Sequence, residues 1–190
     1  MIFDKIIILD LDETLIYATK KPLKRVQDFM VGSYFVYVRP HAYSFIDFCF
    51  ASFSAVAVWT SSSKDYAEEI SLNLFGDRKE DLAFIWSQER CVRKFDYKRY
   101  ATYWIKDLKK VKRRGYPLEK MIMVDDSPEK LYRQYGNLVR VFPFEGLLPD
   151  DELIHLQQYL SVLAKVDNVR QIEKRGWRSK MSTSKIEQDY

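Results

Sequence analysis

The stretch Ile6-Ile7-Ile8-Leu9-Asp10-Leu11-Asp12-Glu13-Thr14-Leu15 decides the fold of this chain. It opens with four apolar residues, three of them β-branched, which predict a strand buried on both faces. The strand ends in two carboxylates, Asp10 and Asp12. Burying an ionised carboxylate without a partner is costly, so this position indicates a metal site or a reaction centre. The structural alternative is that Asp12 caps a helix while Asp10 is simply solvated.

The composition is that of one globular domain. Of 190 residues, 47% are hydrophobic and 31% charged, and the formal net charge is +4. No segment is long and apolar enough to cross a membrane, and the two cysteines, Cys49 and Cys91, suggest neither a disulfide framework nor a zinc site. The N-terminus runs directly into the first strand, without room for a signal peptide. We therefore expect an intracellular protein, cytoplasmic or nuclear, with no membrane partner.

Basic residues are concentrated in two stretches, 106–114 and 170–185. A solvated helix face is the commoner explanation of such stretches, and no nucleic-acid-binding motif accompanies them. We expect no nucleic-acid partner, and we expect a monomer.

Strands and helices alternate along most of the chain. Beyond the first strand, the pattern predicts strands at 34–38, 55–59, 121–124 and 138–142, and helices at 40–52, 64–74, 106–114, 128–135 and after the expected caps Asp150 and Asp151. This alternation predicts an α/β fold with a mostly parallel central sheet flanked by helices.

Three segments depart from this alternation. Residues 16–28 are expected to form a loop. Residues 77–103 are expected to form a small antiparallel insertion with short strands at 84–86 and 91–93. We assign residues 1–172 to the domain and residues 173–190 to a polar, basic tail.

Polar residues follow three of the predicted strands at their carboxyl ends. These residues are Asp10, Asp12 and Thr14 after the first strand, Thr60 and Ser61 after the strand at 55–59, and Asp125 and Asp126 after the strand at 121–124. In parallel sheets the carboxyl ends of the strands form the binding edge, so the three groups should meet there.

These residue types suit phosphoryl transfer. Asp10 could attack phosphorus and form an aspartyl-phosphate, and Asp12 could serve as general acid and then base, with a raised pKa. Several carboxylates in one pocket call for a hard divalent cation, and Mg²⁺ is the natural choice. Thr60 could donate its hydroxyl to the transferring group. Lys64 and Lys106 are both candidates for the cation. Lys106 is favoured because it lies just before the helix that leads into the strand at 121–124, whereas Lys64 starts a helix and is expected to be exposed.

In combination these motifs resemble the haloacid dehalogenase superfamily of phosphotransferases. More narrowly, the chain is similar to the FCP/SCP-type, NLI-interacting-factor-like phosphatases, which include RNA polymerase II C-terminal-domain phosphatases. The segments that carry the resemblance are Asp10-Leu11-Asp12-Glu13-Thr14-Leu15, Val38-Arg39-Pro40-His41, Trp59-Thr60-Ser61-Ser62, Lys106-Asp107-Leu108, Val124-Asp125-Asp126-Ser127-Pro128, Asp151-Glu152-Leu153 and Val166-Asp167-Asn168-Val169.

The resemblance implies a Rossmann-like domain without a large cap. It implies the following roles: Asp10 as nucleophile, Asp12 as acid/base, Thr60 and Lys106 as phosphate binders, Thr14 and Ser61 as substrate-binding residues, and Mg²⁺ held by Asp10, the Asp12 backbone carbonyl and Asp126, with Asp125 in the same acidic set. An open site of this kind suits phosphoserine or phosphothreonine on a protein. In that group an arginine of the insertion grips substrate, and Gln88 stands at its place here.

Two other functions compete with this hypothesis. One is a small-molecule phosphomonoesterase of the same superfamily, and an open or a closed site would discriminate between the two. The other is a non-catalytic phosphate-binding module on the same fold. The fact that every position the chemistry needs is filled argues against this last function.

Overall fold

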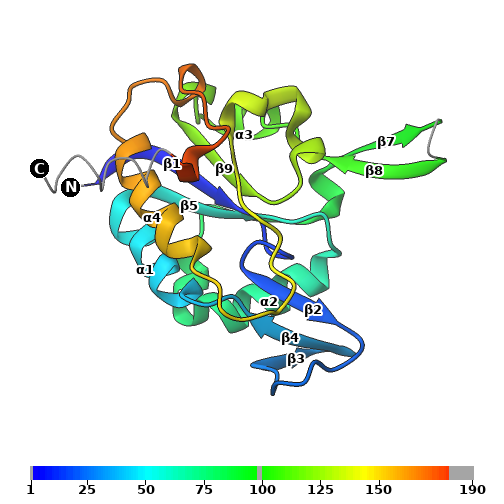
Figure 1. The fold of residues 1–190 in the computed structure, drawn as a ribbon. Helices are drawn as coiled ribbons and strands as arrows, with labels where there is room; N and C mark the ends of the chain where they lie inside the picture. The colour runs from blue at the N-terminus through cyan, green and yellow to red at the C-terminus, as the bar shows by residue number, and fades with distance from the viewer. Residues whose placement is uncertain (1, 98–99, 180–190) are drawn as a thin grey trace, which may run out of the picture.

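The computed structural model describes residues 2–97 and 100–179. Its centre is a parallel sheet of five strands in the order β10-β9-β1-β5-β6, with β1 in the middle (Figure 1). The bounds of these strands are β1 Phe3–Leu9, β5 Phe53–Trp59, β6 Ile85–Trp86, β9 Met121–Asp125 and β10 Leu138–Arg140. The predicted α/β class with a central parallel sheet is confirmed.

Side chains of β1 alternate between two apolar layers, as the strand period of two requires. Ile7 and Leu9 pack into the layer formed with α1, α2 and α4, whereas Ile6 and Ile8 pack into the layer on the opposite face, under α3 and the 3₁₀ segment η4. The helices span α1 Ala42–Ser52, α2 Lys64–Phe75, α3 Lys109–Lys112 and α4 Glu152–Leu163, and η4 spans Pro128–Asn137. Helices on both faces bury β1 from Lys5 to Leu9, which explains its continuous apolar run.

A second, antiparallel sheet follows β1 directly. Its order is β2-β4-β3, and its strands are β2 Ile16–Thr19, β3 Phe29–Val31 and β4 Tyr34–Val38. The predicted loop at 16–28 is therefore wrong in its first part, because Tyr17 pairs with Tyr37 in this sheet. The four residues of β2 gain their strand conformation from this pairing, and the polar residues after them hid the signal.

The predicted insertion at 77–103 is arranged differently from the expectation. β6 is the edge strand of the central sheet, where Trp86 pairs in parallel with Trp59. The antiparallel pair is instead β7 Val92–Asp96 with β8 Ala101–Ile105, and it extends away from the body of the molecule (Figure 1). Four further 3₁₀ segments are η1 Gly76–Asp81, η2 Gln88–Arg90, η3 Leu118–Lys120 and η5 Val169–Gln171.

Part of the polar C-terminal segment packs against the domain. Trp177 is buried and stacks on Tyr159 with ring centroids 5.2 Å apart, and the ammonium of Lys174 donates to the carbonyl oxygen of Gly136 at 2.7 Å. The packed unit thus continues past residue 172 to at least Trp177. Residues 180–190 of the predicted tail lie outside the described part of the chain.

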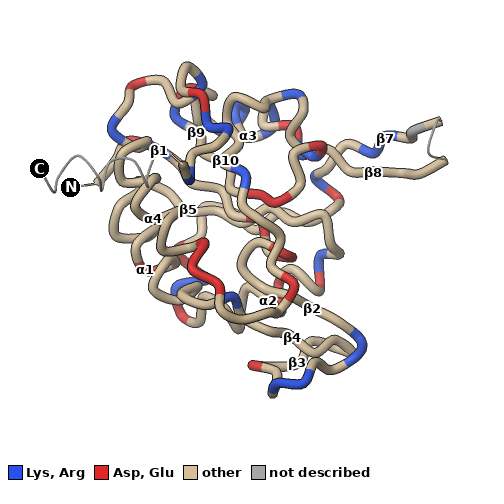
Figure 2. Tube along the Cα trace, viewed as in Figure 1, with Lys and Arg blue, Asp and Glu red and all other residues tan. Residues whose placement is uncertain are grey.

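Two other expectations concern the surface. Within residues 2–97 and 100–179, no helix is long and apolar enough to cross a membrane. Lysine and arginine are spread over many elements of the trace (Figure 2). The expected basic helix at 106–114 is shorter in the structure, where α3 spans four residues.

Candidate active site

The carboxyl ends of three central strands place Asp10, Thr60 and Asp125 at one edge of the sheet. The amide of Asp10 donates to Val124 on β9 at 3.0 Å, and the amide of Thr60 donates to Trp86 on β6 at 2.8 Å. These bonds continue the sheet ladder past the last strand residues. The backbone of each polar residue is therefore fixed by the sheet itself, as the strand-end rule predicts.

Lys106 lies between two of these carboxylates. Its ammonium nitrogen is 2.8 Å from Oδ1 of Asp10 and 2.6 Å from Oδ2 of Asp125, and its side chain is fully buried. Strand β8 ends just before Lys106, and the Lys106 amide donates to the carbonyl oxygen of Lys130 at 2.9 Å. The other candidate cation, Lys64, is exposed at the start of α2, so of these two lysines the structure places Lys106 at the carboxylates.

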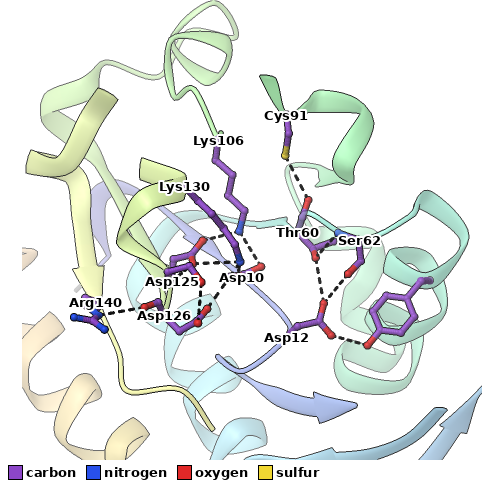
Figure 3. A network of polar contacts seen from close by, with 12 residues as sticks. Asp10, Asp12, Thr60, Ser62, Cys91, Lys106, Asp125, Asp126, Lys130 and Arg140 are labelled. Atoms are coloured by element: carbon purple, nitrogen blue, oxygen red, sulfur yellow. Dashed lines mark hydrogen bonds and ion pairs between the residues drawn. The ribbon is translucent and has the colours of Figure 1, made fainter. Parts of the chain in front are cut away.

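A second lysine, which sequence reasoning missed, faces the same carboxylates. The ammonium of Lys130 lies 3.3 Å from Asp10, 3.8 Å from Asp125 and 4.0 Å from Asp126 (Figure 3). Lys130 sits one turn into η4, directly after β9. The sequence does place Lys130 four residues after Asp126, and this spacing could have suggested a site residue. A lysine at such a position is, however, equally well explained as a surface residue.

The carboxylate of Asp12 points away from this cluster, toward α2. Its Oδ1 accepts a 2.6 Å hydrogen bond from the hydroxyl of Tyr66, and its Oδ2 accepts bonds from Ser62 at 2.8 Å and Thr60 at 3.4 Å (Figure 3). Tyr66 and Ser62 were not among the predicted site residues. The site therefore has two halves: a lysine-bound cluster around Asp10, and a hydroxyl-lined pocket around Asp12.

The pKa values of the two aspartates at the end of β1 shift in opposite directions. For Asp12, burial and the charge of Asp10 raise the pKa against the hydrogen bonds from Tyr66 and Ser62. For Asp10, burial also acts to raise the pKa, but the charges of Lys106 and Lys130 outweigh it and lower the pKa. Such a divergence suits one carboxylate to nucleophilic attack and the other to proton transfer.

Three acidic side chains can hold a cation together. One oxygen from each of Asp10, Asp125 and Asp126 lies within 4.8 Å of the others, and all three residues are buried. Oδ1 of Asp126 is buried and accepts no hydrogen bond within the described chain, and its ion-pair contact with the Lys130 ammonium is long, at 4.0 Å. Burial and the charge of Asp10 raise the pKa of Asp125 to about 7. This all-oxygen donor set fits Mg²⁺, whereas the Asp12 carboxylate lies outside it.

Known proteins match both the sequence and the fold. The family model of NLI interacting factor-like phosphatases matches residues 5–170. The chain belongs to this family. It is accordingly a phosphoric monoester hydrolase of the FCP/SCP type, as the motifs at the strand ends predicted.

Relatives of this phosphatase range from viral to human proteins. The CTD phosphatase-like protein 355R of Invertebrate iridescent virus 3 is 34% identical over 182 residues, covering 82% of this chain and 95% of the viral protein. Human carboxy-terminal domain RNA polymerase II polypeptide A small phosphatase 1 is 28% identical over 176 residues. That match covers 87% of this chain and 62% of the human protein, and Drosophila melanogaster phosphatase Herzog, 28% identical, is covered over 46% of its length.

A solved structure has the same fold. The fission yeast RNA polymerase II CTD phosphatase Fcp1, bound to beryllium fluoride, superposes with a TM-score of 0.55 at 17% identity. The comparison covers 98% of this chain and 56% of Fcp1. At this identity the likeness shows the shared fold.

The two predicted substrate-binding residues of this phosphatase lie beside the site in different ways. Thr14 is fully buried, and its hydroxyl makes no hydrogen bond within the described chain, while its carbonyl oxygen accepts a 3.1 Å bond from Arg39. Ser61 is half-buried next to Thr60, but the serine that reaches Asp12 is Ser62. Thr14 therefore lies in the packed interior of the protein.

A surface pocket opens onto the Asp12 half of the phosphatase site. It has a volume of about 310 Å³ and is lined by Asp12, Ala18, Tyr34, Ser62, Ser63 and Tyr66. Its walls come from α2 and from the β2-β4-β3 sheet. Because Asp12 lies in its wall, a group that entered this pocket would lie close to that carboxyl group.

Proposed function

We propose that this phosphatase is Mg²⁺-dependent and forms an aspartyl-phosphate on Asp10, and that its substrates are proteins carrying phosphoserine or phosphothreonine. The observation that carries the proposal is the pairing of a lysine-bound Asp10 with a separately held Asp12 at one sheet edge. These are the residues that a two-step phosphoryl transfer needs: a nucleophile, a proton donor and charge compensation.

In the first step, a carboxylate oxygen of Asp10 attacks phosphorus and the bond from phosphorus to the ester oxygen breaks. Asp12 gives its proton to the leaving alkoxide, and the hydroxyl groups of Tyr66 and Ser62 then stabilise the Asp12 carboxylate. In the second step, water attacks the phosphoryl group while Asp12 takes one of its protons. Inorganic phosphate leaves and the carboxylate of Asp10 is restored.

Charge compensation comes from two sources. The buried ammonium of Lys106 lies beside Asp10, where it can neutralise negative charge on the transferring group. A bound Mg²⁺, held by Asp10, Asp126, the Asp12 backbone carbonyl and, within the same acidic set, Asp125, would supply further positive charge to the phosphoryl oxygens. The hydroxyl group of Thr60 donates a hydrogen bond to Asp12 and could instead donate to the phosphoryl oxygens of a bound substrate.

Several observations support a protein substrate. The relatives named as CTD phosphatases are consistent with a phosphorylated protein, and the pocket beside Asp12 is open to the surface. Tyr34 and Tyr66 line this pocket and meet edge to face with ring centroids 5.9 Å apart, so they give it an apolar wall for residues next to the phosphate.

The experiment that tests this function measures hydrolysis of a generic aryl phosphate with and without Mg²⁺. We expect hydrolysis that depends on Mg²⁺, a phosphoryl adduct on Asp10 in intact-mass and peptide spectra after acid quenching, and neither in Asp10→Asn. Asp4→Asn changes an exposed aspartate and is the matched control. Folded wild-type protein no more active than Asp10→Asn would refute the catalytic mechanism.

A second assay addresses the substrate class. Phosphoserine and phosphothreonine peptides should be turned over with higher kcat/KM than the corresponding free phosphoamino acids. Equal values for peptides and free phosphoamino acids would favour the small-molecule phosphomonoesterase instead.

A further inference from the structure

Lys130 occupies a position that a bound divalent cation would need. Its ammonium nitrogen lies within 4.0 Å of Asp10, Asp125 and Asp126, which are the three residues whose oxygens converge closely enough to hold a metal ion. A metal ion bound to the same three carboxylates would come very close to this ammonium group. A metal ion and an ammonium group that share the same three carboxylates in a buried site repel each other strongly.

The charge balance of the acidic cluster does not require Lys130 once a divalent cation is bound. With all three aspartates ionised, the cluster of Asp10, Asp125 and Asp126 carries −3, and the ammonium groups of Lys106 and Lys130 contribute +2. Lys106 and one divalent cation would balance the same cluster without Lys130. Lys130 therefore compensates the site while no metal ion is bound and is in excess once one binds.

Lys106 is more deeply buried than Lys130 and lies closer to its carboxylate partners. The side chain of Lys106 is completely buried between two carboxylates at 2.8 and 2.6 Å, and it has no route to solvent. The side chain of Lys130 is 20% exposed, and its contacts to the aspartates are longer, from 3.3 to 4.0 Å. Its backbone is held at both ends, since its amide donates to Ser127 and its carbonyl oxygen accepts from Lys106. Only its flexible stem has to move for the ammonium group to leave.

From these contacts we infer that Lys130 is a built-in competitor of the metal ion: it closes the resting site over Asp10, and the divalent cation displaces its ammonium group toward solvent. The inference rests on the proposed Mg²⁺ site. It explains why the side chain of Asp10, the proposed nucleophile, is only 1% exposed although it must meet a substrate. Departure of Lys130 uncovers Oδ2 of this carboxylate.

The first test measures Mg²⁺ binding without substrate, by isothermal titration of the whole 190-residue chain. Lys130→Met keeps the apolar stem and removes the charge, so we expect it to bind Mg²⁺ about tenfold or more tightly than the wild type. Lys130→Arg should retain the weaker, wild-type-like affinity. Lys120→Met removes a comparable ammonium group near Asp4, outside the site, and should not change the affinity.

The second test needs no variant. Acetylation of lysines in the wild type, followed by peptide mass spectrometry, should label Lys130 poorly in EDTA and several-fold faster with Mg²⁺, because the displaced ammonium group faces solvent. The labelling of Lys106 should stay low in both conditions, since it is buried.

The outcomes separate this inference from the proposed function. Equal or weaker Mg²⁺ binding by Lys130→Met, or labelling of Lys130 that does not respond to Mg²⁺, would overturn the inference even if the enzyme hydrolyses phosphate esters. Absence of Mg²⁺ binding by both proteins would also overturn it, and Lys130 would then be a permanent ion-pair partner. Tighter binding together with Mg²⁺-dependent labelling would support it even before a substrate is known.

Discussion

The hydroxyl group of Tyr66 donates a 2.6 Å hydrogen bond to Oδ1 of Asp12, and this bond joins the first turn of α2 to the segment that follows β1. Ser62 makes the second short bond, 2.8 Å to the other carboxylate oxygen. Together they turn the Asp12 carboxylate away from the cluster of Asp10, Asp125 and Asp126. The proposed proton donor is thereby held apart from the proposed metal ligands.

Replacing Tyr66 by Phe should lower kcat without a comparable change in KM or Mg²⁺ affinity. The variant loses the donor that orients Asp12 and stabilises its carboxylate after proton transfer, so we expect a fall of about tenfold to a hundredfold in kcat. Steady-state kinetics with an aryl phosphate measures this. Tyr43→Phe changes an exposed tyrosine on α1 and should leave kcat unchanged. An unchanged kcat in Tyr66→Phe would show that this bond does not position the acid.

Replacing Lys106 by Met should destabilise the fold strongly in the absence of metal. The variant leaves Asp10 and Asp125 buried with only Lys130 to compensate them, and breaking a buried ion pair in this way costs about 3–5 kcal/mol of unfolding free energy. Urea unfolding in EDTA is the measurement, with Lys109→Met on the exposed side of α3 as the control. A loss below about 1 kcal/mol would mean that the pair contributes as little as a surface salt bridge.

Arg39 and Asp150 form a bidentate ion pair that closes the fold behind the site. The guanidinium donates to the two carboxylate oxygens at 2.9 and 2.8 Å and to the carbonyl oxygen of Thr14 at 3.1 Å. Asp150 also accepts from the amide of Glu152, so the expected cap of α4 is made by Asp150, while Asp151 makes no side-chain cap bond.

Removal of the Arg39 charge should therefore lower the free energy of unfolding. We expect Arg39→Met to lower the free energy of unfolding by about 3 kcal/mol, because Arg39 is buried and Asp150 is left without its partner. A double-mutant cycle with Asp150→Asn should show that the two losses are not additive. Additive losses would mean that the pair contributes no coupling energy.

Asp107 should make the fold sensitive to acid. Burial acts to raise its pKa, but the hydrogen bonds from Arg133, the Lys109 amide and Gln134 outweigh burial and lower the pKa below its usual value. A carboxyl group with a lowered pKa in the folded state stabilises the fold above its unfolded-state pKa. This stabilisation is lost as the pH falls through the folded-state value.

The corresponding variant is Asp107→Asn. It should be less stable than the wild type by about 1–2 kcal/mol near neutral pH, and the difference should shrink as the pH falls below about 4. Urea unfolding across this pH range measures it, and the exposed Asp77→Asn should show no such change. A difference that stays constant with pH would mean that ionisation of Asp107 does not contribute.

The sequence by itself determined which residues meet at the sheet edge. Asp10, Thr60 and Asp125 each follow a buried apolar strand, and the alternation of strands and helices makes these strands parallel, so their carboxyl ends must lie together. Lys106 could be chosen over Lys64 because Lys106 lies just before the helix that leads into β9, whereas Lys64 starts a helix, where a lysine is ordinarily exposed. Short-range pattern was sufficient for Asp10, Thr60 and Asp125, because one sheet places all three residues.

Tertiary structure decided what each side chain contacts. Tyr66 and Lys130 lie on α2 and η4, and only the packing of these elements turns them toward Asp12 and Asp10. The strand at Ile85–Trp86 joins the central sheet because Trp86 pairs with Trp59, and Trp177 is buried because it stacks on Tyr159. Such contacts join residues far apart in the chain, and their direction depends on how helices and strands are oriented. Local apolar periodicity carries no information about that orientation.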